Sequence, residues 1–184
     1  GIILFLIMYT NTEKKSEIEI IPKKKQDEVK KQLDNEIANE RDVFYNIEYS
    51  GLDLSGNRYI LRAKEAFNEQ NNQNIIKMKE VEAIFYFKDD TILKIFSEKG
   101  IYNNKTLDMI FIRNVKADYE GSSLIAQKAE YSNSKNFLHI SEKVVLNDSR
   151  GAFSADKLRF DINNQTLSIA SNENNKIDVN LNIK

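Results

Sequence analysis

The sequence has no cysteine and no tryptophan, and it contains one histidine, one proline and six glycines in 184 residues. Without cysteine the chain forms no disulfide framework, holds no thiolate-ligated metal and carries no cysteine nucleophile or lipidated cysteine. The single imidazole, that of His139, excludes any site built on two histidines, which includes most catalytic zinc centres. We therefore expect no enzyme activity, no metal and no cofactor.

Charge and hydropathy exclude two further classes of protein. Lys and Arg number 27 against 28 Asp and Glu, and this balance provides no general attraction for nucleic acid. Hydrophobic residues make up 41% and charged residues 30% of the chain, which is typical of a globular protein. A mean hydropathy of -0.54 excludes a polytopic membrane protein.

The first nine residues, GIILFLIMY, are apolar and uncharged. A helix of this length spans roughly 13 Å, against about 30 Å for the hydrocarbon core of a bilayer. We therefore interpret residues 1–9 as the C-terminal part of a transmembrane anchor helix. The core of a signal peptide is an alternative, although no small-x-small cleavage site follows Tyr9, and an ordinary strand is another.

Residues 10–42 are polar and mixed in charge. After Pro22, the apolar residues Val29, Leu33 and Ile37 recur every four residues, which predicts a short amphipathic helix. We interpret this segment as a charged, partly helical linker between the anchor and a domain at residues 43–184.

From Phe44 onward the hydrophobic period changes to two, and asparagine-rich clusters separate the apolar runs. Alternation of this kind is typical of half-buried strands, and asparagine favours the turns between them. The domain is therefore predicted to be all-β. Its last strand is the clearest, because the apolar residues Ile177, Val179, Leu181 and Ile183 alternate with polar ones.

The domain also contains an internal repeat. The pattern Lys-x-x-aromatic-polar occurs four times, with the aromatic residue at Phe67, Tyr102, Tyr131 and Phe160. A valine recurs between these aromatics, at Val81, Val115 and Val144. A single pair of strands is marginally stable in water, so successive units must stack their apolar faces. The aromatics and valines are predicted to point inward, where they would line a groove or simply pack a core.

A stack of strands leaves two edges, near Phe44–Tyr49 and at the Ile177, Val179, Leu181 and Ile183 strand. Open edges are templates for pairing with another chain.

Other groups with potential chemistry have ordinary interpretations. Asp89 and Asp90 are predicted to form a hairpin turn, and His139 to lie in a plain strand. Asp53 lacks the spacing of a calcium loop.

Three segments carry a resemblance to a known family. Residues 50–63, SGLDLSGNRYILRA, contain an aspartate, a glycine-containing turn, an aromatic residue and a strand that ends in alanine. The Gly100–Asn103 step and the Val115…Gly121 strand and turn follow the same rhythm. With the apolar stub before them, residues 44–184 resemble the LptC family of lipopolysaccharide-export proteins.

The resemblance implies an open, twisted antiparallel β-jellyroll (LptA/LptC-like) in the periplasm, held by one inner-membrane helix. It implies that the protein accepts lipopolysaccharide from an ABC transporter and passes it to an LptA bridge. The acyl chains would lie in a groove lined by Phe67, Val81, Tyr102, Val115, Tyr131, Val144 and Phe160. The N-terminal edge would meet the periplasmic domains of an LptF/LptG-like transporter, and the C-terminal edge an LptA-like protein.

Three other functions compete with this interpretation. A soluble LptA-like bridge would follow if residues 1–9 were a signal peptide, and a β-scaffold for envelope assembly would bind no lipid. A small hydrolase has the least support, because no nucleophile accompanies the single histidine. The repeat lysines, which would meet lipid phosphates or remain plain exterior charges, are Lys64, Lys99, Lys128 and Lys157.

Overall fold

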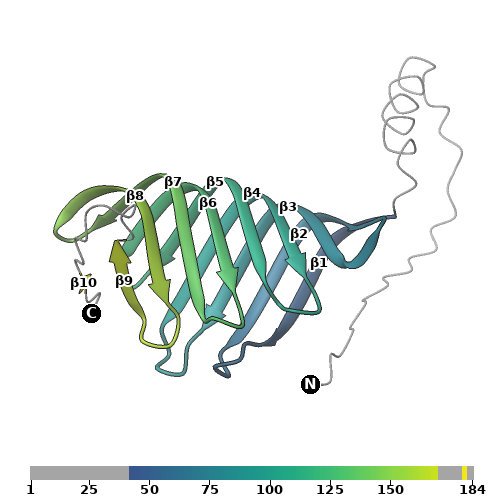
Figure 1. Cartoon of the computed structure of the whole chain (residues 1–184), viewed down its shortest axis with the longest axis horizontal. Coiled ribbons are helices and arrows are strands. Elements are labelled where there is room, and N and C mark those ends of the chain that lie inside the picture. Colours follow the sequence, from purple (N-terminus) through teal and green to yellow (C-terminus); the bar gives the residue numbers. More distant parts are fainter. Residues whose placement is uncertain (1–41, 170–179, 182–184) are drawn as a thin grey trace, which may run out of the picture. The chain divides into compact units, whose positions relative to one another are not determined.

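The computed structural model describes residues 42–169 and 180–181. Within them the strands form one antiparallel sheet in chain order, and Figure 1 shows this succession from β1 onward. The strands are β1 (Val43–Leu52), β2 (Arg58–Glu69), β3 (Asn72–Tyr86), β4 (Ile92–Asn103), β5 (Met109–Tyr119), β6 (Ser122–Ser132), β7 (Phe137–Asp148), β8 (Gly151–Asp161), β9 (Thr166–Ile169) and β10 (Asn180–Leu181). The all-β prediction is confirmed, and none of the described residues is helical. The predicted anchor helix and linker helix lie outside the described residues.

The sheet is open. Each strand pairs with its neighbours in the chain, so β1 forms one edge and β10 the other, and no pairing between described residues joins these two edges. This arrangement confirms the predicted open antiparallel sheet and is consistent with a β-jellyroll.

An interruption of the strand pairing runs across the sheet, and we call this line the bend. The pairing of the first four strands skips Asn46, Lys64 and Glu80. Register irregularities then fall at Phe96/Lys99, Ile112/Val115, Ile125/Lys128 and Ser141/Val144. Positive φ values occur on the line in alternate strands, at Asn46, Glu80, Arg113, Asn114, Glu142 and Lys143. Bulges of this kind bend a strand and increase its twist.

The bend divides the sheet into two half-sheets. Half-sheet A contains residues 47–52, 58–63, 81–86, 92–97, 115–119, 122–126, 144–148 and 151–155. Half-sheet B contains residues 43–45, 65–69, 72–79, 99–103, 109–112, 128–132, 137–141, 157–161 and 166–169. The strands are long, up to the 15 residues of β3, because each of β1 to β8 continues through the bend.

Ring contacts between strands that are not neighbours show that the half-sheets face each other. The ring of Phe85 in half-sheet A lies 5.0 Å from that of Tyr131 in half-sheet B, although β3 and β6 are not adjacent. Tyr119 and Phe160, on β5 and β8, are 5.3 Å apart. The core is therefore a single layer of side chains between two halves of one folded sheet.

The sequence explains where the bend falls. Polar residues interrupt the apolar alternation there, as Glu80 does in β3 and Asn114 does in β5. Each repeat valine then directly follows a residue with positive φ, and Val81, Val115 and Val144 are all buried. These valines are the first inward residues of half-sheet A in β3, β5 and β7.

Gly100 lies beside the bend, where two strands pack closely. A Cβ atom at this position would lie 2.9 Å from Cγ2 of Val81 and 3.4 Å from the carbonyl oxygen of Ile110. The absence of a side chain is therefore required for the approach of β3 and β5 on either side of β4.

Candidate lipid-binding interior

Two unbroken rows of apolar residues line the interior, from β1 to β8 in half-sheet A and from β1 to β9 in half-sheet B. In half-sheet A the paired residues are Tyr49, Leu61, Ala83, Ile95, Ala117, Leu124, Leu146 and Phe153. In half-sheet B they are Phe44, Ala66, Met78, Gly100, Phe111, Ala129, Ile140, Leu158 and Ile169. The interior is therefore an apolar strip that crosses every strand from β1 to β8 and ends on β9 in half-sheet B.

Three of the four repeat aromatics lie together on a further row of half-sheet B. Tyr102, Tyr131 and Phe160 are all buried there, and Ile76, Met109, Leu138 and Leu167 alternate with them in the pairing. The structure thus brings these three aromatics into one line, with the repeat valines beside the bend on the opposite half-sheet.

Phe67 does not join this line. It is only partly buried, whereas its neighbour Ala66 is buried in the inward row. The residue of β2 that stands in line with Tyr102 is Asn68, through the pairing of both with Ile76. The prediction that Phe67 points inward is therefore wrong. The repeat spacing there is 35 residues rather than 29, and side chains of consecutive strand residues face opposite sides.

The tyrosine hydroxyls inside the core find partners across it. The hydroxyl of Tyr59 lies 3.0 Å from that of Tyr102, and Tyr131 donates a 3.2 Å hydrogen bond to Oδ1 of Asn133. Burial raises the pKa of Tyr102 and of Tyr131 well above the ordinary value for tyrosine, because a phenolate would be poorly solvated there.

The interior is filled by its own side chains. The buried residues form one cluster that extends from Tyr59 to Leu167, with ring contacts that reach across it. A hollow does exist elsewhere, on the outer side of the bend, but charged residues line it: Lys64, Glu65, Lys79, Glu80, Glu98 and Lys99. Acyl chains would therefore enter the interior only if the half-sheets separated or the side chains moved.

Both ends of the apolar strip reach the surface. Phe44 pairs with the buried Ala66 on the inner face of β1, yet it is 49% exposed. At the other end Phe153 pairs with the buried Leu146 and is 41% exposed. Neither residue belongs to the aromatic repeat, so the repeat did not predict that their rings lie on the inner face. The alternation of Phe153 with Ala155 was a signal in the sequence that the ring of Phe153 faces inward.

The long sides of the two half-sheets opposite the bend meet at a line of turns, which we call the mouth. The β1–β2 loop of half-sheet A contacts two loops of half-sheet B. The backbone N–H of Leu54 donates a 3.1 Å hydrogen bond to Oδ1 of Asn133, and the hydroxyl of Ser55 bonds to Asn163. Asn133 and Asn163 both lie in turns, as the asparagine-rich clusters between the apolar runs predicted.

Gln165 makes a second set of contacts across the mouth. Its Oε1 accepts a 2.9 Å hydrogen bond from the hydroxyl of Thr91, which follows β3, and another from the hydroxyl of Tyr119. Gln165 lies between β8 and β9 in half-sheet B, whereas Thr91 and Tyr119 belong to the half-sheet A side.

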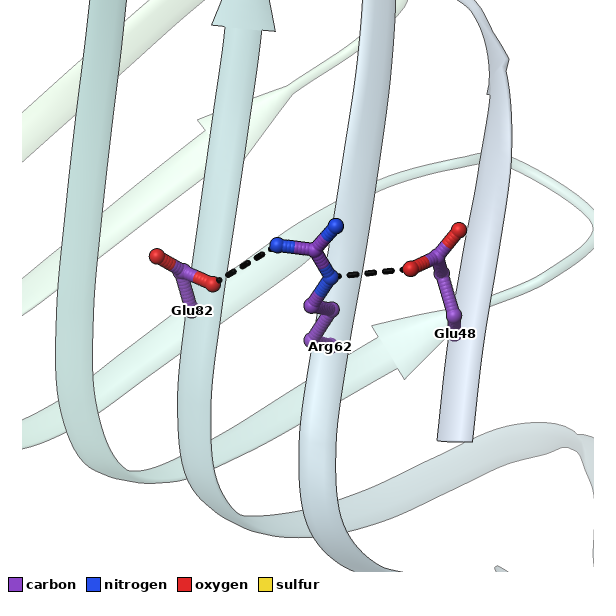
Figure 2. A network of polar contacts seen from close by, with 3 residues as sticks. All are labelled: Glu48, Arg62 and Glu82. Carbon is purple, nitrogen blue, oxygen red and sulfur yellow. Dashed lines mark hydrogen bonds and ion pairs between the residues drawn. The ribbon is translucent and has the colours of Figure 1, made fainter. Parts of the chain in front are cut away.

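The N-terminal edge strand is held on its outer face by an ionic network. Figure 2 shows Arg62 of β2 between Glu48 of β1 and Glu82 of β3. The Nε atom of Arg62 lies 2.8 Å from Glu48, and its Nη1 atom lies 3.2 Å from Glu82.

At the other edge, only one of the four apolar residues of the predicted last strand is described: Leu181 of β10 pairs with Leu167 of β9. The other three, Ile177, Val179 and Ile183, lie outside the described residues.

The remaining predicted groups lie where the sequence indicated. Asp89 and Asp90 form the turn after β3, and His139 is exposed on β7. Asp53 accepts hydrogen bonds from the backbone and side chain of Asn57 within its own loop. Among the residues that the structure describes, no group of three acidic or histidine side chains is placed to hold a metal ion.

Lys99, Lys128 and Lys157 lie in one row on the outer face beside the bend.

An open antiparallel sheet folded around an apolar core defines a β-jellyroll-like protein. The chain belongs to the lipopolysaccharide-assembly, LptC-related family, whose model matches residues 2–177. A comparison with curated proteins gives no match.

Family membership gives the protein a role in lipopolysaccharide transport, and this is not a known family of enzymes. The family works in the cell envelope, which agrees with the predicted periplasmic and membrane-associated setting. Residues 42–169 and 180–181 include no helix long and apolar enough to cross a bilayer.

Proposed function

We propose that this protein is an inner-membrane-anchored periplasmic carrier that accepts lipopolysaccharide from an ABC transporter and passes it to an LptA-like bridge. The observation that supports this best is the pair of apolar rows, from Tyr49 to Phe153 and from Phe44 to Ile169. Acyl chains are stabilised wherever a continuous apolar surface is screened from water. A strip with an exposed aromatic ring at each end offers such a path along the sheet.

The open edges support edge-to-edge contacts with partners. In this proposal β1 pairs with a strand of the LptF/LptG-like transporter domains, and the C-terminal edge at β9 and β10 pairs with the LptA-like protein. Strand addition uses the unpaired N–H and C=O groups of an edge. Proline at Leu181 is expected to block co-purification with the LptA-like protein while the domain stays folded. Unchanged co-purification would count against the C-terminal contact.

A photo-crosslinking phenylalanine at Tyr131 tests whether lipid occupies the interior. Tyr131 is buried in the interior, whereas Tyr45 is 64% exposed and lies on the outer face, paired with Glu65. The same replacement at Tyr45 is therefore the matched control. We expect a lipopolysaccharide adduct at Tyr131 and none at Tyr45 in cells that are exporting the lipid.

If the Tyr131 variant does not fold, Phe153 provides a second position, because it is on the inner face but already partly exposed. Absence of adducts at both Tyr131 and Phe153 would contradict the carrier function. That result would favour the β-scaffold that binds no lipid, which the filled interior makes the second candidate.

A further inference from the structure

The two long sides of the folded sheet are joined in different ways. At the bend each strand continues from one half-sheet into the other through its own backbone. At the mouth the hydrogen bonds that cross between described residues each use a side chain. They join Leu54 to Asn133, Ser55 to Asn163, and Thr91 and Tyr119 to Gln165. The mouth can therefore separate without breaking a strand ladder, whereas the bend cannot.

Among these residues, Asn133 has both its amide oxygen and its amide nitrogen hydrogen-bonded. It is 5% exposed, and its Oδ1 accepts from the N–H of Leu54 across the mouth and from the hydroxyl of Tyr131. Its Nδ2 donates to the carbonyl oxygen of Thr106, and its backbone N–H donates to Asp108. Asn133 is thus fixed within half-sheet B by its donors, while one acceptor bond reaches half-sheet A.

The mouth contacts are also coupled to the rings of the interior. Tyr131 bonds to Asn133 and packs its ring against Phe85 of half-sheet A. Tyr119 of half-sheet A bonds to Gln165 and packs its ring against Phe160 of half-sheet B. Each of these tyrosines therefore bonds to a residue of the mouth and also packs its ring against the facing half-sheet.

We propose that the mouth is a lateral entrance, and that Asn133, Asn163 and Gln165 form a clasp that holds it shut until lipid displaces the interior rings. This inference rests on the proposed carrier function and adds the route by which the lipid enters. With the clasp open, acyl chains pass sideways between the loops, and the sugar headgroup stays in water outside the mouth. An entry only through the ends at Phe44 and Phe153 is the alternative.

The chain has no cysteine, so an introduced pair of cysteines can form only the intended disulfide within the chain. Oxidation of the variant Ser55→Cys with Asn163→Cys forms a disulfide that bridges the mouth. The control pair is Ser123→Cys with Asn147→Cys, which are exposed Cα partners within half-sheet A and leave the mouth free. Both variants carry a photo-crosslinking phenylalanine at Phe160, a buried ring that makes no hydrogen bond, and both are tested as purified full chain with purified lipopolysaccharide.

Bridging the mouth before lipid is added should lower the adduct at Phe160 by about tenfold or more, because the fraction of entry-competent protein falls, and reduction should restore it. Bridging after loading should slow release into a detergent chase by about the same factor. The control pair should change neither.

Each other outcome is decisive. Equal adducts in the bridged and reduced states would overturn the clasp and leave the carrier function standing, with entry through the ends. No adduct even in the reduced state would overturn the carrier function, and the clasp with it. If the first pair does not bridge, Thr91→Cys with Gln165→Cys replaces it. Failure of both pairs would show that the mouth does not hold this closed geometry, which also overturns the clasp.

Discussion

The hydroxyl groups of Tyr59 and Tyr102 lie 3.0 Å apart and join β2 to β4 across the interior. Because these strands are not neighbours in the sheet, this hydrogen bond links half-sheet A directly to half-sheet B. It is a polar contact placed among apolar side chains, where an unpaired hydroxyl is costly.

Replacement of Tyr102 by phenylalanine should therefore destabilise the domain by about 1–2 kcal/mol, since it leaves the Tyr59 hydroxyl without this partner. Chemical denaturation measures the change. Tyr45→Phe is the matched control, because that side chain is exposed and should leave the free energy of unfolding unaltered. Equal stability of the two variants would show that the tyrosine pair contributes nothing.

The buried tyrosines also predict how stability depends on alkaline pH. Burial raises the pKa of Tyr59, Tyr102 and Tyr131 above the ordinary value of 10.0. Above that value the unfolded chain loses these phenolic protons while the folded chain keeps them. The unfolded state then binds fewer protons, and the free energy of unfolding falls as the pH rises.

We expect this loss to begin near pH 10, the ordinary tyrosine pKa, and the phenolate absorbance of Tyr59, Tyr102 and Tyr131 to appear together with unfolding rather than before it. Ultraviolet titration alongside circular dichroism checks the coincidence. The Tyr102→Phe variant should lose stability less steeply over the same range. Phenolate formation by all eight tyrosines in the folded protein would contradict the prediction.

Gly100→Ala should destabilise the domain by about 1–3 kcal/mol, because the added methyl group overpacks the space against Cγ2 of Val81 at 2.9 Å. A double-mutant cycle isolates the cause. Val81→Ala removes the clashing atom, so the double variant should be more stable than the sum of the single changes implies. Strict additivity would place the cost elsewhere, for example against the carbonyl oxygen of Ile110.

Arg62→Met should loosen β1 with little effect on the stability of the whole domain. The ion pairs of Arg62 with Glu48 and Glu82 are largely exposed, and such pairs contribute at most about 1 kcal/mol. They nevertheless hold the edge strand on its outer face (Figure 2). Amide hydrogen exchange should rise in residues 47–52 and stay constant in β7 and β8.

The comparison for this variant is Arg150→Met, which removes an ion pair with Asp148 inside the β7–β8 turn and leaves β1 intact. Equal exchange of β1 in both variants would show that the network does not retain the edge. High salt should reproduce the effect of Arg62→Met in the unaltered chain, because exposed ion pairs are screened.

The sequence predicted the strands well because alternation and asparagine turns are local signals. It also found Tyr102, Tyr131 and Phe160, which repeat at a constant spacing of 29 residues and share one row. Phe67 was misplaced because alternation is sensitive to a shift of one residue, and the first repeat is longer. The wide gap between Phe111 and Val115 in an otherwise alternating strand was the available indication of the bend.

The hydrogen bonds across the mouth could not be predicted from the sequence, for a different reason. Asn133 and Gln165 meet Leu54 and Thr91 across 79 and 74 residues of sequence. Both appear locally as ordinary turn residues. Only the folding of the sheet onto itself at the bend brings these turns together, and no local pattern specifies which turn faces which.

The pairing order has a consequence for how the chain acquires its structure. Each strand joins the one made just before it, so the ladders can grow by zipping as the polypeptide emerges, and such short-range closure is kinetically favourable. However, the ring of Phe87, which follows β3, packs against Phe160 of β8, which comes 73 residues later in the chain. We therefore expect nascent chains that stop before β8 to have paired strands but an apolar interior that is still exposed to water. Such chains should need protection from aggregation until the last quarter of the polypeptide has been synthesised.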